Sequence, residues 1–436
     1  RCLSDWSSDV CSSDLWGAQM RVVDAPAEEA GLLPASDAAS GGAPGLAPPV
    51  RTVSAARQIE VVFRDTRGEA EGAVAAIERL VYEDHVIAAI GGVITAEVDA
   101  AAVAADELGL PFVGFSRTEG FADASEWVFR DMLTNSAVAD ALVEFAMGEM
   151  GMSRFAVLHP DIEYGQEMTA LFRERVEERG GTVSGVQSYA QDATTFSEPI
   201  RVLVKKDNVT ERAEYQRKIH ELRLQGIKDA RRRRNAIEKI RQSISPIIDF
   251  QALFVPDHWK TVALVAPALA FEDVITNWCD ERDIRRIEKT TGHRVSPVML
   301  LGGNTWNHRD LPARAGKYIN CSVFVDGYHA GSVRAETVRF VEAFTAARGR
   351  QPAMLEAYGA EAALVVRFAI ETAQPQTRRA FLEAVHAIDG LEGPMGRIRV
   401  TDEGEIVHPL YLLTVDGGAI REWGVEPAPE DEDGAL

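Results

Sequence analysis

The stretch of residues 86–130 constrains the fold of this chain more than any other. It holds two short apolar runs, residues 86–90 (VIAAI) and 110–115 (LPFVGF), with an alanine-rich helical pattern at residues 98–108 between them. Short runs of β-branched and aromatic residues bounded by glycine and proline indicate buried strands. A strand, a helix and a strand within about thirty residues predict a βαβ unit, and therefore a parallel sheet.

Small hydroxyl residues follow both predicted strands of this unit. Thr95 comes after the first strand, and Ser116 and Thr118 come after the second. Ligands of open parallel sheets bind outside the carboxyl ends of the strands. Two loops that carry hydroxyls and backbone amides at one sheet edge suit a small polar or anionic ligand, although serine and threonine are also ordinary turn and cap residues.

The same alternation of strands and helices continues and then restarts after Arg130. Further strands are predicted at residues 58–65, 154–160, 182–189, 252–256 and 297–301. Helices are predicted at residues 70–82, 134–150, 167–179, 261–271, 337–347 and 357–372, and a hairpin at residues 410–415 and 419–423. Two successive α/β units of similar design indicate two lobes with a cleft between them.

Both ends of the sequence depart from this pattern. Residues 1–15 resemble the translation of a sequencing adaptor, so we exclude them from the fold and expect the natural N-terminus to be missing. Residues 35–49 have the composition of a flexible linker, and residues 424–436 that of an acidic disordered tail.

Charge and composition narrow the functional classes. The net charge of −21 argues against general binding of nucleic acids. No run of eighteen apolar residues is present, so no transmembrane segment is predicted in this sequence. Without the first fifteen residues only Cys279 and Cys321 remain, and they could pair or stay free.

A basic insertion at residues 204–244 interrupts the second α/β unit. Residues 204–241 contain thirteen Lys and Arg against six Asp and Glu. We expect one long or two short helices, with a capping box at Asn208 and Glu211 and a bend at Gly226. The segment is either a solvated helical face or a docking surface for an acidic partner or lipid headgroups. Its centre would then be Arg231, Arg232, Arg233 and Arg234.

Signals of catalysis are absent from the sequence. It has no GxSxG, HExxH, phosphate-binding GxxxxGK[ST] or GxGxxG motif, and the nine histidines have no metal-ligand spacing. His258 and His308 lie after strands, but isolated loop histidines usually serve as hydrogen-bonding groups. We therefore predict no enzyme, no catalytic residue, no cofactor and no metal.

The order of several motifs resembles a known family. These are AIGG, LPFVGFSRT, WVFR, RFAVLHPDIEYG, ALFVPD and LLGGNTWN. The chain is similar to the type I periplasmic solute-binding proteins, of the leucine/isoleucine/valine-binding branch that serves ABC importers. It is equally similar to their relatives, the penicillin-binding protein activators.

The resemblance implies two Rossmann-like lobes with parallel sheets, joined by a hinge of three crossings. The first lobe would comprise residues 16–131 and 327–390, and the second residues 132–326 and 391–423. The first strand of the family would precede Trp16, so the first lobe is expected to lack a strand. The family also implies a periplasmic or envelope-anchored location.

The resemblance further implies the site residues. Thr95, Ser116 and Thr118 of the first lobe would hold a ligand carboxylate, and Tyr164 would close over the ligand from the second lobe. The loop at residues 302–306 has no acidic residue for a ligand ammonium, so Asp257 would replace it, with Asn304 nearby.

Two functions follow from the resemblance. The first is binding of an amino acid or related carboxylate for uptake through an ABC permease. The alternative is a regulatory protein of the same fold that activates a cell-wall synthase.

The role of Trp306 stays open in the sequence. Its side chain could stack on a ligand or cover the core.

Overall fold

The computed structural model describes residues 18–23, 58–292 and 294–425, and they form two compact units. Unit 1 takes the chain up to Met132 and Ala343–His408, and unit 2 takes Leu133–Glu342 and the chain from Pro409. The chain therefore passes between the units three times. The family resemblance implied crossings after Asp131, Asp326 and Gly390. The observed crossings follow Met132, Glu342 and His408, so the second and third lie later in the chain.

The sheet of unit 1 has five strands in the order β2-β1-β3-β4-β5. Its strands are β1 (Ala18–Val23), β2 (Gln58–Phe63), β3 (Ala88–Gly91), β4 (Phe112–Gly114) and β5 (Val128–Arg130). Strands β3, β4 and β5 run parallel, as the βαβ pattern predicted. The helix between the first two is α2 (Thr95–Glu107).

Strand β1 departs from the expectation of a parallel sheet with a missing strand. It lies between β2 and β3 and pairs antiparallel with both, with Met20 opposite Val61 on one side and Ala88 on the other. The sheet therefore holds an antiparallel strand that the sequence did not predict, and the residues before Trp16 lie outside the described part of the chain. The predicted adaptor (residues 1–15) and linker (residues 35–49) lie outside the described residues.

Helices and a small second sheet complete unit 1. Helix α1 (Ala70–Tyr82) packs against α2, and the long helix α12 (Met354–Ala373) contacts β3 and α13 (Arg378–His386). Strands β11 (Asp389–Gly393), β12 (Gly396–Val400) and β13 (Ile406–Val407) form an antiparallel sheet. The core of α1, α2, β3 and β4 is built largely of alanine and branched aliphatic side chains, including Ile77, Leu80 and Val98.

The sheet of unit 2 has seven strands in the order β15-β14-β10-β9-β8-β6-β7. The strands are β6 (Arg154–Pro160), β7 (Thr182–Tyr189), β8 (Ala252–Phe254), β9 (Met299–Gly302), β10 (Val323–Asp326), β14 (Tyr411–Asp416) and β15 (Ala419–Glu422). The first five run parallel to one another, and β14 and β15 form the predicted hairpin at one edge.

Unit 2 also holds helices α3 (Asn135–Val143), α4 (Glu163–Glu178), α5 (Ser197–Leu203), α8 (Trp259–Phe271), α9 (Glu281–Thr291) and α10 (Leu311–Ala315). Helix α11 (Ala335–Arg348) contains the second crossing, between Glu342 and Ala343. Helix α3 continues as a π-helical turn at Glu144–Glu149, within the range predicted as one helix. Helix α4 begins four residues before its predicted start, so Tyr164 lies in a first helical turn rather than a loop. Among the described helices, none is both long and apolar enough to cross a membrane.

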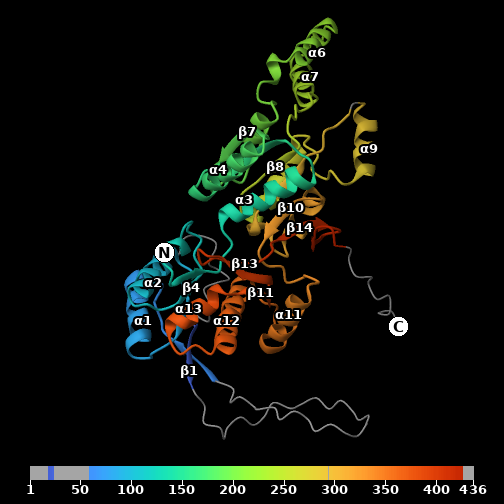
Figure 1. The fold of residues 1–436 in the computed structure, drawn as a ribbon. Coiled ribbons are helices and arrows are strands. Elements are labelled where there is room, and N and C mark those ends of the chain that lie inside the picture. The colour runs from blue at the N-terminus through green and yellow to red at the C-terminus, as the bar shows by residue number, and fades with distance from the viewer. Residues whose placement is uncertain (1–17, 24–57, 293, 426–436) are drawn as a thin grey trace, which may run out of the picture. The chain divides into compact units, whose positions relative to one another are not determined.

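The basic insertion forms two short helices, α6 (Ala213–Leu224) and α7 (Ala230–Gln242), which pack against each other as a hairpin (Figure 1). Gly226 takes the bend with a φ of 62°. A small core of its own holds the hairpin together; its buried members are Val209, Tyr215, Ile219 and Ile244. The predicted capping box is wrong, because Asn208 precedes a 3-10 turn at Val209–Glu211 and makes no side-chain cap.

A disulfide joins Cys279 and Cys321 in unit 2, which settles the alternative that the sequence left open. Their Cα atoms lie 5.9 Å apart. The indole Nε1 of Trp278 donates a hydrogen bond to the carbonyl oxygen of Cys321 at 2.7 Å. The disulfide and this hydrogen bond together connect the loop before α9 to the residues just before β10.

Loss of this disulfide is expected to lower the free energy of unfolding by about 2–4 kcal/mol, since the bond closes a loop of 42 residues in the unfolded chain. The measurement is urea unfolding of the Cys279→Ser, Cys321→Ser double variant against the parent. A reducing agent should lower the midpoint of the parent and leave that of the double variant unchanged. Equal stability of the two proteins would contradict the expectation.

Candidate functional site

The strand ends of unit 1 hold two of the predicted hydroxyl residues in a pinned loop. Ser116 follows β4 and is 2% exposed, and its Oγ accepts a hydrogen bond from the backbone N–H of Thr118 at 3.2 Å. The guanidinium of Arg130, at the end of β5, donates to the carbonyl oxygen of Thr118 and, at 2.7 Å, to Oε2 of Glu405. The Thr118 side chain is exposed at the end of this loop.

Thr95 lies on the neighbouring strand end, as the exposed first residue of α2. The backbone N–H of Phe115 donates to the carbonyl oxygen of Gly92 at 3.1 Å, which joins the loops after β3 and β4. Gly92 has a φ of 78°, and a Cβ there would lie 2.8 Å from the Cβ of Val98, so only glycine fits this turn. A helix N-terminus beside exposed hydroxyls favours an anionic group.

The strand ends of unit 2 converge on Asp257. Its carboxylate accepts hydrogen bonds from the Tyr189 hydroxyl at 2.7 Å and from the backbone N–H of His258 at 2.6 Å. The Thr305 hydroxyl donates to the backbone carbonyl oxygen of Asp257 at 2.7 Å. These contacts bring the ends of β7, β8 and β9 together around one half-buried carboxylate.

Tyr164 and Asn304 lie at the same strand ends. Asn304 opens the 3-10 turn Asn304–Trp306 after β9 and is half-buried. A Cβ at Gly303 would lie 3.7 Å from the Tyr164 hydroxyl oxygen, so the tyrosine approaches the loop that also contacts Asp257. In unit 2, Tyr164 and Asp257 therefore both lie close to the loop at residues 303–306, which contains Asn304.

Burial raises the pKa of the Asp257 carboxyl above its ordinary value, and the hydrogen bonds from Tyr189 and His258 offset this only in part. Burial and the neighbouring Asp257 also raise the pKa of Tyr189, so its hydroxyl stays protonated and donates. The Thr261 hydroxyl lowers the pKa of Asp257 in the same direction as the other two donors, and all three donors are neutral groups. The environment of Asp257 therefore favours the arrival of a positive charge.

The stability of the ligand-free protein should depend on pH through Asp257. Because its pKa in the folded state lies above the ordinary value of 3.8, the folded state holds this proton more tightly than the unfolded state. Its contribution to the free energy of unfolding therefore falls as the pH rises from 3.8 through the folded-state pKa. Asp257→Asn cannot titrate, so the variant should gain in stability relative to the parent between about pH 4 and pH 7. Melting temperatures of both proteins across this range test the expectation, and a difference that does not change with pH would contradict it.

The other side chains considered in the sequence have structural roles. Trp306 is completely buried in the core of unit 2. Of the two alternatives left open by the sequence, the structure therefore favours a core residue over one that stacks on a ligand. His258 caps α8, because Nδ1 accepts from the backbone N–H of Lys260 at 3.3 Å. The ring of His308 stacks on Trp259 with 4.0 Å between the centroids.

The four arginines of the insertion stand apart from these strand ends. Arg231, Arg232, Arg233 and Arg234 form the first turn of α7 and are exposed. Asp229 caps this helix, and its Oδ1 accepts from the backbone N–H of Arg232 at 2.7 Å. Four cations at the positive end of a helix dipole are electrostatically unfavourable, so they do not serve the stability of α7.

Several polar residues of the site were missed from the sequence. Tyr189, Thr305 and Arg130 make the hydrogen bonds that hold the loops, yet each reads as an ordinary strand or turn residue. Glu361 could have been found, because it is a carboxylate within the apolar stripe of the predicted helix at residues 357–372.

A described pocket of unit 2 lies elsewhere. Its volume is about 570 Å³. Its lining includes Ile248, Val274, Ile287, Arg294 and Tyr318. None of the predicted site residues lines it, so cavity volume alone does not mark the candidate site.

Solved structures similar to this chain are binding proteins of transporters. A leucine-binding protein from Thermotoga maritima is 20% identical with a TM-score of 0.52, and the match covers 83% of this chain and 85% of that one. A putative branched-chain amino acid ABC transporter protein from Rhodospirillum rubrum is 19% identical with a TM-score of 0.62, covering 83% and 86%. A solute-binding protein from R. palustris in complex with benzoate is 16% identical with a TM-score of 0.52, covering 83% of each chain.

At these identities the likeness establishes the fold, the type I periplasmic binding protein fold. No curated protein matches this chain. The sequence profile of the family described as "Periplasmic binding protein" matches residues 6–207 and 289–419, and leaves out the segment that contains α6 and α7. Because this match spans well over half of the sequence, the chain belongs to the periplasmic binding protein family.

Proposed function

We propose that the protein binds a small polar ligand, an amino acid or a related carboxylate, and closes its two lobes on it for uptake through an ABC permease. The observation that carries this proposal is the half-buried Asp257, whose carboxylate is held at converging strand ends by neutral donors. A buried carboxylate in such surroundings gains most from a cationic group.

The two units supply complementary chemistry for such a ligand. In unit 1, Thr95, Ser116 and Thr118 combine hydroxyls and backbone amides near the start of α2, which suits a carboxylate. In unit 2, Asp257 would receive the ammonium, with Tyr164 and Asn304 beside it. A ligand that contacts both lobes favours the closed state by its differential affinity for that state.

The proposed location is the periplasm or the outer face of a membrane. Membership of the family supports it, and so does the disulfide between Cys279 and Cys321, since such bonds persist mainly in oxidising compartments. The protein acts in this proposal as a binding protein and not as an enzyme.

A thermal-shift screen with paired ligands tests the proposal. Each amino acid is compared with the acid that lacks its amino group, for example leucine with 4-methylpentanoate, and benzoate is included. A ligand at a hundredfold excess over its dissociation constant raises the free energy of unfolding by about 2.7 kcal/mol. A shift with the amino acid and not with its partner is expected, and Thr118→Ala and Tyr164→Phe should reduce it. No shift with any amino acid or carboxylate would overturn the proposal.

A second candidate function rests on the basic hairpin of α6 and α7. The family profile leaves this segment out, and its four exposed arginines sit where they weaken their own helix. These observations favour a regulatory protein of the same fold that binds an acidic partner surface, such as that of a cell-wall synthase of the penicillin-binding protein class.

Charge reversal separates the two candidates. Arg231, Arg232, Arg233 and Arg234 are changed to glutamate, and the control reverses exposed Arg282, Arg285 and Arg286 of α9. Both solute uptake and cell-wall synthesis are measured in cells. If the α7 variant loses activity while the α9 control and the Thr118 and Tyr164 variants keep it, the regulatory function is favoured. The opposite pattern favours solute binding.

A further inference from the structure

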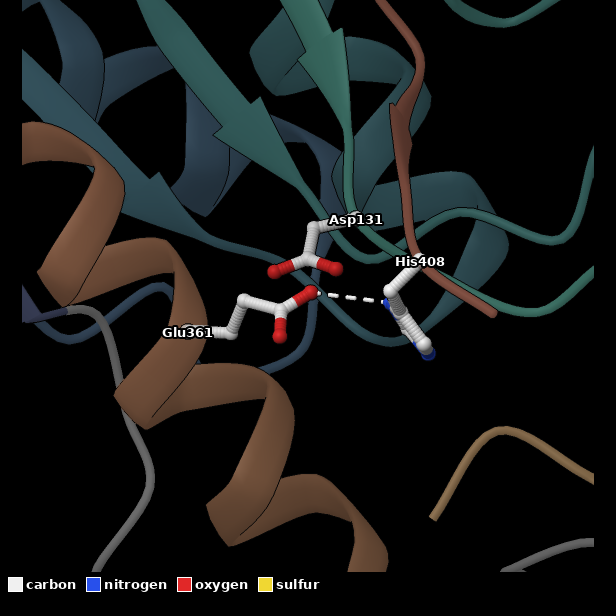
Figure 2. Close-up of side chains that lie close together, drawn as sticks. All are labelled: Asp131, Glu361 and His408. Carbon is white, nitrogen blue, oxygen red and sulfur yellow. Dashed lines mark ion pairs between the residues drawn. The ribbon is translucent and has the colours of Figure 1, made fainter. Parts of the chain in front are cut away.

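Three metal-ligating side chains meet inside unit 1, away from the hydroxyl residues of the candidate site. Asp131 follows β5, Glu361 lies in the middle of α12, and His408 follows β13. Figure 2 shows the three side chains pointing toward one another from these separate elements. One ligand atom from each residue lies within 4.8 Å of those of the other two.

The cluster is sealed from solvent. Asp131 and Glu361 are 0% exposed, and the side chain of His408 is 6% exposed. The backbone positions of the cluster are also fixed. The N–H of Asp131 donates to the carbonyl oxygen of Gly114 at 3.1 Å, and Arg130 holds Glu405 close to the start of β13.

The two carboxyl groups of this cluster have few partners in the surrounding protein. His408 Nδ1 lies 2.9 Å from Glu361 Oε1, and this is the only ion pair that either carboxylate makes among the described residues. Both carboxylate oxygens of Asp131 lack a hydrogen-bond partner within the described part of the chain. The neighbouring guanidinium of Arg130 is directed at Glu405 and Thr118 instead. Burial of charged carboxylates without partners is very costly, so these groups either hold protons or bind a cation.

We propose that Asp131, Glu361 and His408 bind one divalent transition-metal ion of the Zn²⁺ class. An imidazole nitrogen with two carboxylates is a ligand set that suits Zn²⁺ or Mn²⁺, whereas Ca²⁺ and Mg²⁺ prefer oxygen ligands alone. With a neutral imidazole, the two positive charges of the ion equal the two negative charges of the ionised carboxylates.

The dimensions of the cluster fit this ion. Ligand atoms around a four-coordinate Zn²⁺ lie about 3.3 Å apart, given bonds of about 2.0–2.1 Å. Metal binding would draw the three ligand atoms, which now lie within 4.8 Å of one another, to this spacing. Gly393 leaves the necessary room, because a Cβ at that position would lie 3.0 Å from Glu361 Oε2.

The position of the site gives the ion a structural role. Asp131 and His408 stand at two of the places where the chain leaves unit 1, next to the boundaries at Met132 and His408. An ion bound there would tie both chain exits to α12. The inference is therefore independent of which ligand the strand ends of the two units bind.

Equilibrium metal analysis of the untagged protein tests the proposal. The protein is stripped with EDTA, equilibrated with Zn²⁺, passed over a desalting column and analysed by mass spectrometry of the metal. One Zn²⁺ per chain is expected, with a rise in melting temperature. Asp131→Asn and Glu361→Gln should each weaken Zn²⁺ binding by more than about 100-fold, since even outer-shell changes cost 10- to 100-fold. Glu371→Gln is the control, an exposed carboxylate on the same helix.

Co²⁺ provides a readout that needs no variant. Visible absorption bands typical of Co²⁺ bound by nitrogen and oxygen should appear in the parent protein and vanish when Zn²⁺ is added. Absence of stoichiometric Zn²⁺ and of Co²⁺ bands would overturn the proposal. So would Zn²⁺ binding that Asp131→Asn and Glu361→Gln leave unchanged, because the ion would then occupy surface residues.

Discussion

Replacing Asp257 with asparagine is expected to weaken the binding of an amino acid by about 30-fold to about 4,000-fold. Truncating one member of a desolvated, hydrogen-bonded charge pair costs about 2–5 kcal/mol, which corresponds to this range of dissociation constants. Asparagine keeps the size of the side chain and can still accept the hydrogen bond from Tyr189, so the loss reports the missing charge. Isothermal titration of the parent and the variant with the amino acid found in the screen measures the effect.

Asp161 offers a matched control in the same unit. It follows β6, is exposed, and accepts a hydrogen bond from Gln166 at 3.0 Å, so Asp161→Asn removes a strand-end carboxylate without touching the site around Asp257. Its affinity should match that of the parent. Unchanged amino acid affinity in Asp257→Asn would show that the ammonium lies elsewhere.

Trp306→Ala is expected to lower the free energy of unfolding by about 3–5 kcal/mol, the usual cost of deleting a large buried aromatic side chain. Trp306 is 0% exposed, and its ring centroid lies 6.0 Å from that of Phe324. Its Nε1 donates to the carbonyl oxygen of Val255 at 3.2 Å. Chemical unfolding monitored by circular dichroism gives the free energy.

Two further substitutions separate packing from hydrogen bonding at this position. Trp306→Phe keeps most of the buried area and loses the bond to Val255, so it should cost about 1–3 kcal/mol. Phe271→Ala removes an aromatic ring that is 75% exposed and should change stability by less than about 0.5 kcal/mol. A small effect of Trp306→Ala, with altered ligand binding, would instead assign Trp306 to the binding site.

The fold was largely predictable from local patterns. Residues 154–160 and 182–189 were predicted as strands with the bounds that β6 and β7 have, because apolar and β-branched residues end there at proline, glycine or polar turns. Strand β10 was missed although it lies inside its sheet, between β14 and β9. Strand β1 was missed because its place depends on pairing with β2 and β3, and no local pattern encodes a partner.

The candidate site was predictable only in part. Loops that follow strands could be recognised, and so could their hydroxyl and carboxylate residues. Their contacts could not, because the bond between Tyr189 and Asp257 joins residues that lie far apart in the sequence. The same reason hid the cluster of Asp131, Glu361 and His408, whose members come from three separate elements.

The segment that carries α6 and α7 leaves unit 2 after Val204 and returns to it before Ile247. The backbone N–H of Ile247 donates to the carbonyl oxygen of Val204 at 2.9 Å, so the two ends of the inserted segment are already joined. The entropic cost of closing such a loop grows only slowly with its length, and the hairpin supplies a core of its own. The hairpin of α6 and α7 can therefore be gained, lost or exchanged without strain on the neighbouring strands. A graft at this place should keep Lys206, because its Nζ pairs with the buried Glu272 of unit 2.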